Sequence, residues 1–255
     1  MFRRLLLVLA LAASAPVLAS RLAPPPPLVA LQLVDRDAVR ALPEYRHRGQ
    51  AWVAGTPGHR YAVRLTNTTG ERVLVVLSVD GVNAVSGETA APSQAGYVLG
   101  PWESAEIAGW RKSLDDIAQF VFTDLAGSYA ARTGRPDNVG VVGIAVFRER
   151  PRRPLPPPPL AASPQAKAAG ADRAMASEAM PQRIGTGHGQ REWAPVGQTT
   201  FERAGSVPQQ VSELRYDSVD ALVALGVLPR HQPIHAGGPP RAFPAGFVPD
   251  PPRDR

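Results

Sequence analysis

Acidic, amide and basic side chains gather in stretches whose composition is typical of turns and loops. Carboxylates in such positions could ligate a cation or act as general acid and base. Turn chemistry explains the same residues separately, because Asp and Asn stabilise turns and arginines pair with nearby acids. Both interpretations stay open. The residues are Asp80, Asn83, Glu88, Arg132, Arg135, Asp137 and Asn138.

A second candidate group is aromatic. Tyr97, Trp102 and Trp110 lie within one short region of the sequence. On a sheet face, aromatic rings can stack on sugars or on peptide side chains, and they can equally close the end of a hydrophobic core. The polar and the aromatic group together are the candidate binding residues.

Sequence motifs of catalysis are not found: GxSxG, HExxH, P-loop and GxGxxG patterns do not occur. The chain has no cysteine, which excludes disulfides, a thiol nucleophile and cysteine-ligated metals. The GTGHG run at 185–189 lacks the strand and helix that would let it cradle a phosphate, and we expect a flexible turn there. We therefore predict no catalytic residue, no metal and no cofactor.

The net charge of +6 does not indicate a nucleic-acid-binding protein. Residues 43–150 hold equal numbers of basic and acidic side chains, and the positive surplus lies on either side of them. Nucleic-acid binding needs a clustered basic face, usually with interleaved aromatic residues. No such cluster is visible, so no nucleic-acid partner is predicted.

The element that would position the candidate residues is a β-hairpin within Arg72–Gly87. The apolar run Val73–Val79 meets Asp80-Gly81, and a second β-prone run follows. Asp-Gly between two such runs predicts a hairpin, because a type I′ turn needs positive φ at both central residues. Alternate valines point to one face, and Leu74 and Val76 to the other, so both faces are at least partly covered.

Further strand-like segments, separated by turn residues, recur about every ten residues, which is typical of an antiparallel sandwich or jelly roll. The predicted fold is all-β: an antiparallel, jelly-roll-like β-sandwich over 44–149, with long Pro/Ala-rich disordered segments and a short C-terminal helix. The strands expected besides the hairpin are 50–53, 60–67, 96–99, 104–110, 117–123 and 139–147.

Residues 1–19 have the features of a secretory signal peptide of bacterial type. A short positive segment precedes an apolar stretch, and Val17 and Ala19 supply the small residues of a cleavage site. The apolar stretch is shorter than the about 20 residues that span a bilayer, although an uncleaved anchor stays an alternative. We expect cleavage after Ala19 and a periplasmic or secreted protein without a stable membrane span.

Proline-rich composition predicts three segments outside the sandwich. Residues 20–43 are expected to form a Pro-rich linker, with 28–33 as either an edge strand or part of the linker. Residues 150–184 are expected to be a disordered Pro/Ala-rich spacer. Residues 229–255 are expected to be a disordered tail.

Residues 185–228 are expected to be ordered. Strand-like pieces occur at 199–203 and 209–216, and a helix is expected to begin after Ser218 and stop at Gly226. The segment is too short to have a core of its own. We therefore expect it to dock on the sandwich and close an open sheet edge.

Parts of the chain resemble a family of uncharacterised exported bacterial proteins. The resemblance covers residues 45–150 and 185–229, and it implies one module interrupted by a variable spacer. It implies no activity, cofactor or catalytic residue. The stretches that carry it are VDGVNAVSGETA, GYVLGPWESAEIAGWRKS, SYAARTGRPDNVGVVGIAVF, GTGHGQREWAPV and YDSVDALVALGVLP.

These observations predict an exported, non-enzymatic binding or assembly module that uses loops or a sheet edge. Its partner would be an unidentified protein or glycan of the cell envelope. The alternative is a hydrolase-like or cation-binding enzyme built on Asp80, Glu88 and Asp137. Convergence of these three residues and Arg132 in one concave site would favour the alternative, since the fold alone decides neither.

Overall fold

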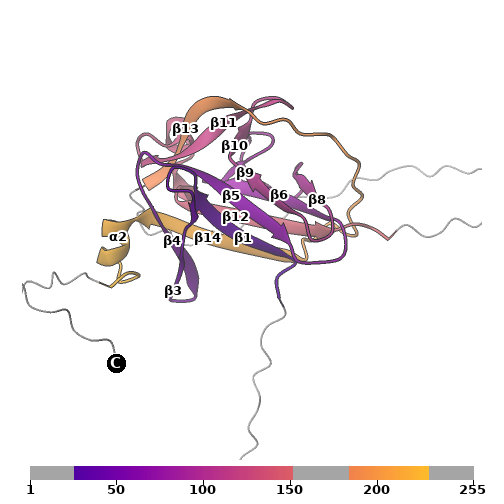
Figure 1. The fold of residues 1–255 in the computed structure, drawn as a ribbon, viewed down its shortest axis with the longest axis horizontal. Helices are drawn as coiled ribbons and strands as arrows, with labels where there is room; N and C mark the ends of the chain where they lie inside the picture. The colour runs from indigo at the N-terminus through magenta and orange to yellow at the C-terminus, as the bar shows by residue number, and fades with distance from the viewer. Residues whose placement is uncertain (1–25, 152–183, 230–255) are drawn as a thin grey trace, which may run out of the picture.

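The computed structural model describes residues 26–151 and 184–229, which form two seven-stranded β-sheets packed face to face (Figure 1). This confirms the all-β sandwich. Sheet A contains β1 (Val29–Asp35), β2 (Arg40–Ala41), β5 (Arg60–Asn67), β9 (Ser104–Ile107), β10 (Gly109–Arg111), β11 (Asp116–Asp124) and β13 (Ile184–Trp193). Sheet B contains β3 (Glu44–His47), β4 (Gln50–Gly55), β6 (Val73–Val79), β7 (Val82–Asn83), β8 (Tyr97–Leu99), β12 (Val141–Arg148) and β14 (Gln210–Ser218).

Sheet A runs in the order β13-β11-β5-β1-β2, with β9 paired to β5 and β10 paired to β11. Sheet B runs in the order β3-β4-β14-β12-β6-β7, with β8 paired to β6. Neighbouring strands are antiparallel, except that β14 runs parallel to β4. Each sheet therefore contains strands from both ends of the described chain.

The central hairpin is confirmed. Asp80 and Gly81 have φ angles of 52° and 73°, as a type I′ turn requires, and Val79 pairs with Val82 across the turn. The odd-numbered valines of β6 face the core between the sheets. Leu74 and Val76 face outward, where they pack in a second, smaller cluster.

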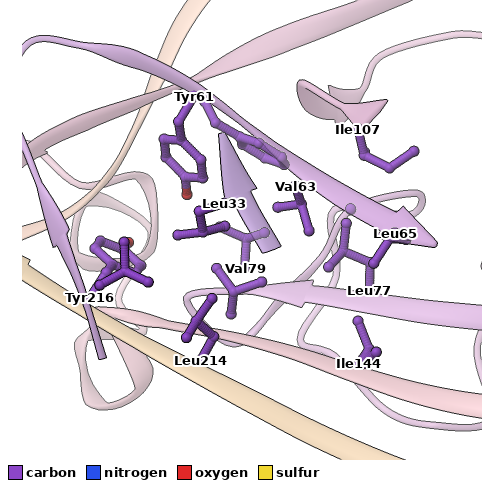
Figure 2. Packing of buried hydrophobic residues seen from close by; sticks show 14 of the residues in the cluster. Leu33, Tyr61, Val63, Leu65, Leu77, Val79, Ile107, Ile144, Leu214 and Tyr216 are labelled. Atoms are coloured by element: carbon purple, nitrogen blue, oxygen red, sulfur yellow. The ribbon is translucent and has the colours of Figure 1, made fainter. Parts of the chain in front are cut away.

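The main core lies between the two sheets (Figure 2). Sheet A contributes Leu33 and Val63, and sheet B contributes Leu77 and Ile144, all buried. Full burial of each such side chain contributes roughly 1.5–3 kcal/mol. At one end of the core the ring of Tyr61 stacks on that of Phe122 at a centroid distance of 4.2 Å.

The prediction of a linker over 20–43 is wrong for its described part. Strand β1 pairs with β5 along its whole length, from Val29 opposite Asn67 to Asp35 opposite Tyr61. The side chain of Val29 enters the core, and Leu42, beyond β2, is buried as well. The sandwich therefore begins before residue 44. Of the two alternatives for 28–33, the structure has the strand, over Val29–Asp35.

The prediction of a flexible turn at 185–189 is also wrong. These residues belong to β13, which pairs with β11 from Asp116 to Asp124. The glycines are required by packing rather than by a turn. A Cβ on Gly185 would lie 2.7 Å from Cβ of Ser128, and one on Gly189 would lie 2.7 Å from Cγ2 of Val121.

Residues 184–228 contribute to both sheets. Strand β13 lies at the edge of sheet A, but β14 is an interior strand of sheet B, inserted between β4 and β12. The expectation that this segment closes an edge is therefore wrong for β14. Residues 199–203 do not form the expected strand: Phe201 instead packs on the outward cluster of Leu74 and Phe147.

Three short helical segments complete the described chain: α1 (Tyr129–Arg132), the 3₁₀ turn η1 (Pro136–Asn138) and α2 (Val219–Ala224). The helix expected after Ser218 is confirmed as α2. Ser218 Oγ accepts the N–H of Ala221 at 3.2 Å, and Gly226 has a φ of 74° just beyond the helix.

The described residues include no helix that is long and apolar enough to cross a membrane. The predictions for residues 1–19, for 152–183 of the spacer and for 230–255 of the tail fall outside the described ranges.

Candidate functional site

Asp80, the central loop carboxylate, is fully buried and held by three hydrogen bonds. Its Oδ1 accepts the N–H of Gly140 at 2.8 Å and the hydroxyl of Tyr216 at 2.6 Å. Its Oδ2 accepts the N–H of Thr186 at 2.7 Å. Burial raises the pKa of Asp80 to about 6, and these hydrogen bonds oppose the rise because they stabilise the charged form.

A hydrogen-bonded chain continues from Asp80 across the sandwich. Thr186 Oγ1 lies 2.5 Å from the hydroxyl of Tyr216 in sheet B and 2.5 Å from that of Tyr61 in sheet A. Figure 2 places both tyrosines at the same end of the core. Burial raises the pKa of each tyrosine well above its usual value, and the Asp80 carboxylate adds to this, so both remain protonated. We call these four residues the Asp80 network; it joins the two sheets.

Asn83 and Glu88 stabilise the loop that follows the hairpin. Asn83 is buried, and its Oδ1 accepts the N–H groups of Val85 at 2.7 Å and Ser86 at 3.1 Å. Its Nδ2 donates to Gln94 Oε1 at 3.0 Å. Glu88 is exposed and accepts from Gln94 Nε2 at 3.2 Å. Turn chemistry therefore accounts for both residues.

The basic and acidic residues of the second loop do not gather around Asp80. Arg135 lies over the ring of Tyr129 at 5.9 Å and reaches Thr89 Oγ1 at 3.5 Å, which links the two loops. Arg132 and Asp137 are exposed and form no ion pair with any residue in the described ranges. Asn138 is also exposed, packed beside Gly81.

The three aromatic candidates have separate roles. Trp110 is buried and meets Phe120 edge-on at a centroid distance of 4.8 Å. Tyr97 is partly buried; burial raises its pKa, and the neighbouring Arg111 opposes the rise. Trp102 is 68% exposed, so it is the member of the group whose ring can meet a ligand.

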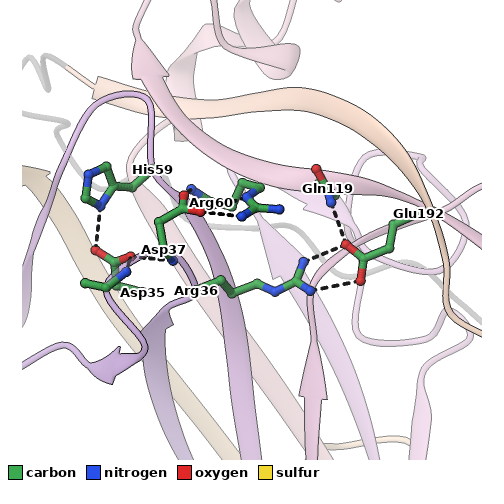
Figure 3. A network of polar contacts seen from close by, with 8 residues as sticks. Asp35, Arg36, Asp37, His59, Arg60, Gln119 and Glu192 are labelled. Carbon is green, nitrogen blue, oxygen red and sulfur yellow. Dashed lines mark hydrogen bonds and ion pairs between the residues drawn. The ribbon is translucent and has the colours of Figure 1, made fainter.

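The sequence did not suggest a polar network on sheet A, where the β1–β2 connection meets the start of β5 (Figure 3). Asp35 is buried, and its Oδ2 lies 2.8 Å from Nδ1 of His59. Burial opposes ionisation of Asp35, but the N–H of Ala38 and the ring of His59 outweigh it and lower the pKa. Asp37 accepts the backbone N–H of Arg60 at 2.6 Å and its Nε at 2.9 Å, which lowers the pKa of Asp37.

Arg36 extends this network to β13. Its guanidinium donates to both carboxylate oxygens of Glu192 at 2.7 and 2.9 Å, and Gln119 Nε2 donates to the same carboxylate at 2.5 Å. The hydrogen bonds from Arg36 are the main reason that the pKa of Glu192 is lowered. Only a strand assignment for residues 29–35 could have suggested that Arg36 and Glu192 meet.

Ligand atoms of Asp35, Asp37 and His59 lie within 4.8 Å of one another, which is close enough for a shared cation. Their hydrogen bonds argue against that use. Both carboxylates already accept backbone N–H groups, and the guanidinium of Arg60 compensates the charge of Asp37. The cluster therefore fastens the β1–β2 connection to β5.

The described surface includes two shallow hollows. One of about 360 Å³ is lined by Arg60, Gln119, Val121, Gly189 and Gln190. The other, of about 580 Å³, is lined by Glu71, Arg72, Arg148, Glu149, Arg150, Pro151 and Ala204. None of the candidate residues from the sequence lines either hollow, so the predicted carboxylates do not share one concave site there.

The two long outer strands of sheet A differ in how their free edges are covered. At β1, the side chain of Gln210 satisfies the edge backbone groups of Val29 in place of a neighbouring strand. Its Oε1 accepts the N–H of Val29 at 3.0 Å, and its Nε2 donates to the carbonyl of Val29 at 2.8 Å. Strand β13 pairs with β11 alone among the described strands. Its first residues, Ile184–Gly187, are buried, whereas Gln190, Arg191 and Trp193 are exposed.

The direction of the backbone groups defines an open edge on the second half of β13. Ala194 donates its N–H to Asp115 at 2.6 Å, and Val196 donates to Leu114 at 2.9 Å. Because hydrogen-bonding direction alternates along an antiparallel strand, the backbone groups of Arg191 and Trp193 point away from β11. A bulge opposite Gln119 and then Pro195, which has no N–H, limit this open edge to residues 189–193.

No protein-family model, no curated protein and no solved structure matches the chain. Function is therefore inferred from geometry and surface chemistry. On the described surface, the open edge of β13 beside Trp193, which is 73% exposed, and the exposed ring of Trp102 are the features best placed to meet a partner.

Proposed function

We propose that the protein is an exported, non-enzymatic binding module whose protein partner adds a strand to the open edge of β13. The observation that carries this proposal is the outward direction of the Arg191 and Trp193 backbone groups, beside an indole that is 73% exposed. Main-chain hydrogen bonds supply affinity in strand addition, and side chains next to the edge supply specificity.

The dimensions of the edge suit a short partner strand. Residues 189–193 offer backbone groups at alternate positions, and the bulge and Pro195 bound them on both sides. Natural proteins guard exposed edges with charges and bulges against uncontrolled pairing. Arg191 supplies such a charge, and its side chain is 67% exposed. A partner strand with a complementary negative charge is therefore favoured over other strands.

Binding is favoured over hydrolysis because the Asp80 carboxylate is fully buried and its oxygens are already bonded. A general base must reach its substrate proton directly or through one water. Glu88 and Asp137 lie in different loops, and within residues 26–151 and 184–229 neither forms an ion pair with a second titratable group. The hydrolase-like or cation-binding alternative therefore has less support than strand addition.

Export to the periplasm or the medium is part of the proposal. It rests on the features of residues 1–19, which match a signal peptide cleaved after Ala19, and on the resemblance to exported bacterial proteins. The lack of cysteine throughout the chain means that folding needs no disulfide formation in that compartment. N-terminal sequencing of the secreted protein tests this part; a mature chain that starts at Met1 would refute it.

Photocross-linking tests strand addition. A benzophenone amino acid is placed at Trp193 in the full chain and, as the control position, at Val211, which is 65% exposed on the other sheet. We expect a discrete protein adduct in the producing bacterium from position 193 and none from 211. Adding Arg191→Pro, which removes an outward N–H, should abolish the adduct, whereas Arg191→Ala, which keeps it, should not. Adducts that are insensitive to Arg191→Pro would contradict strand addition.

A further inference from the structure

The tight turn at Gly100–Glu103 carries a residue that its backbone disfavours. Glu103 donates its N–H to the carbonyl of Gly100 at 3.3 Å, with Pro101 in the second position and Trp102 in the third. Trp102 has a φ of 59°. Turns with positive φ at the third position strongly prefer glycine, and a bulky residue there is strained. Folding alone would therefore favour a glycine at this position over a tryptophan whose ring is 68% exposed.

The strained turn is nevertheless held firmly. The N–H of Trp102 donates to the carbonyl of Thr69 at 3.1 Å, and Nδ2 of Asn67 donates to the carbonyl of Gly100 at 2.6 Å. Asn67 is fully buried. One part of the indole lies beside Gly70: a Cβ at that position would be 3.8 Å from Cζ2, an ordinary van der Waals contact. The rest of the ring faces solvent, on a backbone that these hydrogen bonds hold in place.

A hollow lined mainly by charged residues begins one residue beyond Gly70, the glycine beside the indole. Glu71, which follows Gly70 in the chain, lines the hollow of about 580 Å³ and accepts from Arg148 at 2.5 Å. On its other side Arg72 pairs with Glu149 at 2.7 Å. These ion pairs compensate one another's charge but, unlike buried Asp80, they keep exposed faces: the side chain of Glu71 is 64% exposed and that of Arg148 is 40% exposed. Such carboxylates can accept, and such guanidiniums can donate, a further hydrogen bond.

We propose that Trp102 and this hollow form a saccharide-binding site, independent of the strand-addition edge. The apolar C–H face of a sugar ring can stack on a fixed indole, and its hydroxyls can donate to carboxylates and accept from guanidiniums. A Pro-rich peptide would need an aromatic-lined groove, and none of the residues that line this hollow is aromatic. A strained tryptophan in this turn is understandable if its ring meets a ligand.

Retention on polysaccharides tests the site. The full chain is sedimented with insoluble peptidoglycan, chitin and cellulose, and run through native gels that contain mannan, dextran or laminarin. We expect retention on at least one of them and at least a tenfold loss with Trp102→Gly, at a melting temperature that is unchanged or raised. Trp102→Tyr should keep most of the retention. Trp193→Gly, which removes the other strongly exposed indole, should keep all of it.

Several outcomes would overturn the proposal. Absence of retention on every polysaccharide would do so, as would equal retention of the wild type and Trp102→Gly. A fall of the melting temperature in both Trp102→Gly and Trp102→Tyr would assign the indole to packing. A synthetic peptide with the sequence of residues 150–161 is the competing probe. If this peptide bound in a Trp102-dependent manner and no saccharide did, the ligand of the site would be a Pro-rich segment and the saccharide proposal would be wrong.

Discussion

The two halves of β13 place polar groups in opposite situations. In the first half, Thr186 is buried and both its N–H and its hydroxyl are bonded within the Asp80 network. In the second half, the backbone groups of Arg191 and Trp193 face away from β11, beside an exposed indole. The contrast teaches that polarity alone does not mark a functional residue. Buried, fully bonded groups stabilise this fold, and exposed groups without a strand partner are available for recognition.

The largest expected effect comes from removing the Asp80 carboxylate. In Asp80→Ala the N–H groups of Gly140 and Thr186 and the hydroxyl of Tyr216 lose their acceptor inside the protein. We expect the free energy of unfolding to fall by about 3–5 kcal/mol, measured by urea denaturation. The control Asp137→Ala, in an exposed loop, should change it by about 0.5 kcal/mol or less. Similar losses in both variants would show that the network is not the stabilising feature.

The Asp80 network also predicts a pH dependence. The folded-state pKa of Asp80 is about 6, above its ordinary value of 3.8, so between these pH values the folded chain holds a proton that the unfolded chain has lost. The contribution of Asp80 to the free energy of unfolding is therefore fully present below pH 4. It decreases by up to roughly 3 kcal/mol as the pH rises toward 6. The pKa values of Asp35 and Glu192 are lowered, so these two groups stabilise the fold at neutral pH. Their contribution to the free energy of unfolding is lost as the pH falls below their ordinary pKa values.

Urea denaturation between pH 4.5 and 7 measures this dependence. The wild type should lose stability as the pH rises across the range, and Asp80→Asn, which cannot ionise, should show a flatter profile. An identical slope in both proteins would mean that Asp80 stays ionised throughout.

A smaller effect is expected from the glycines of β13. A Cβ on Gly185 would meet Ser128 at 2.7 Å, so Gly185→Ala should destabilise the fold by about 1–3 kcal/mol through overpacking. Gly197 has nothing within 4 Å of its Cβ position, and Gly197→Ala should be nearly neutral in the same thermal melts. Equal melting temperatures for the two variants would show that the first half of β13 is not tightly packed.

Local sequence chemistry predicted the features that depend on neighbouring residues. Asp80-Gly81 predicted its turn because positive φ restricts the residue types, and Ser218 predicted its helix because a hydroxyl can cap nearby N–H groups. Strand β13 was missed, since the need for Gly185 arises from Ser128, far away in the chain. The surface network was missed for the same reason: Arg36 and Glu192 are brought together only by the folded sheet.

The open edge of β13 is tested most directly by hydrogen exchange of individual amides in the purified full chain, followed by NMR. We expect the amides of Arg191 and Trp193 to exchange rapidly and that of Thr186, bonded to buried Asp80, to be among the most protected. Arg191→Ala should leave this pattern intact. Protection of Arg191 and Trp193 comparable with that of Thr186 in the isolated monomer would contradict the account, because the edge would then already be covered.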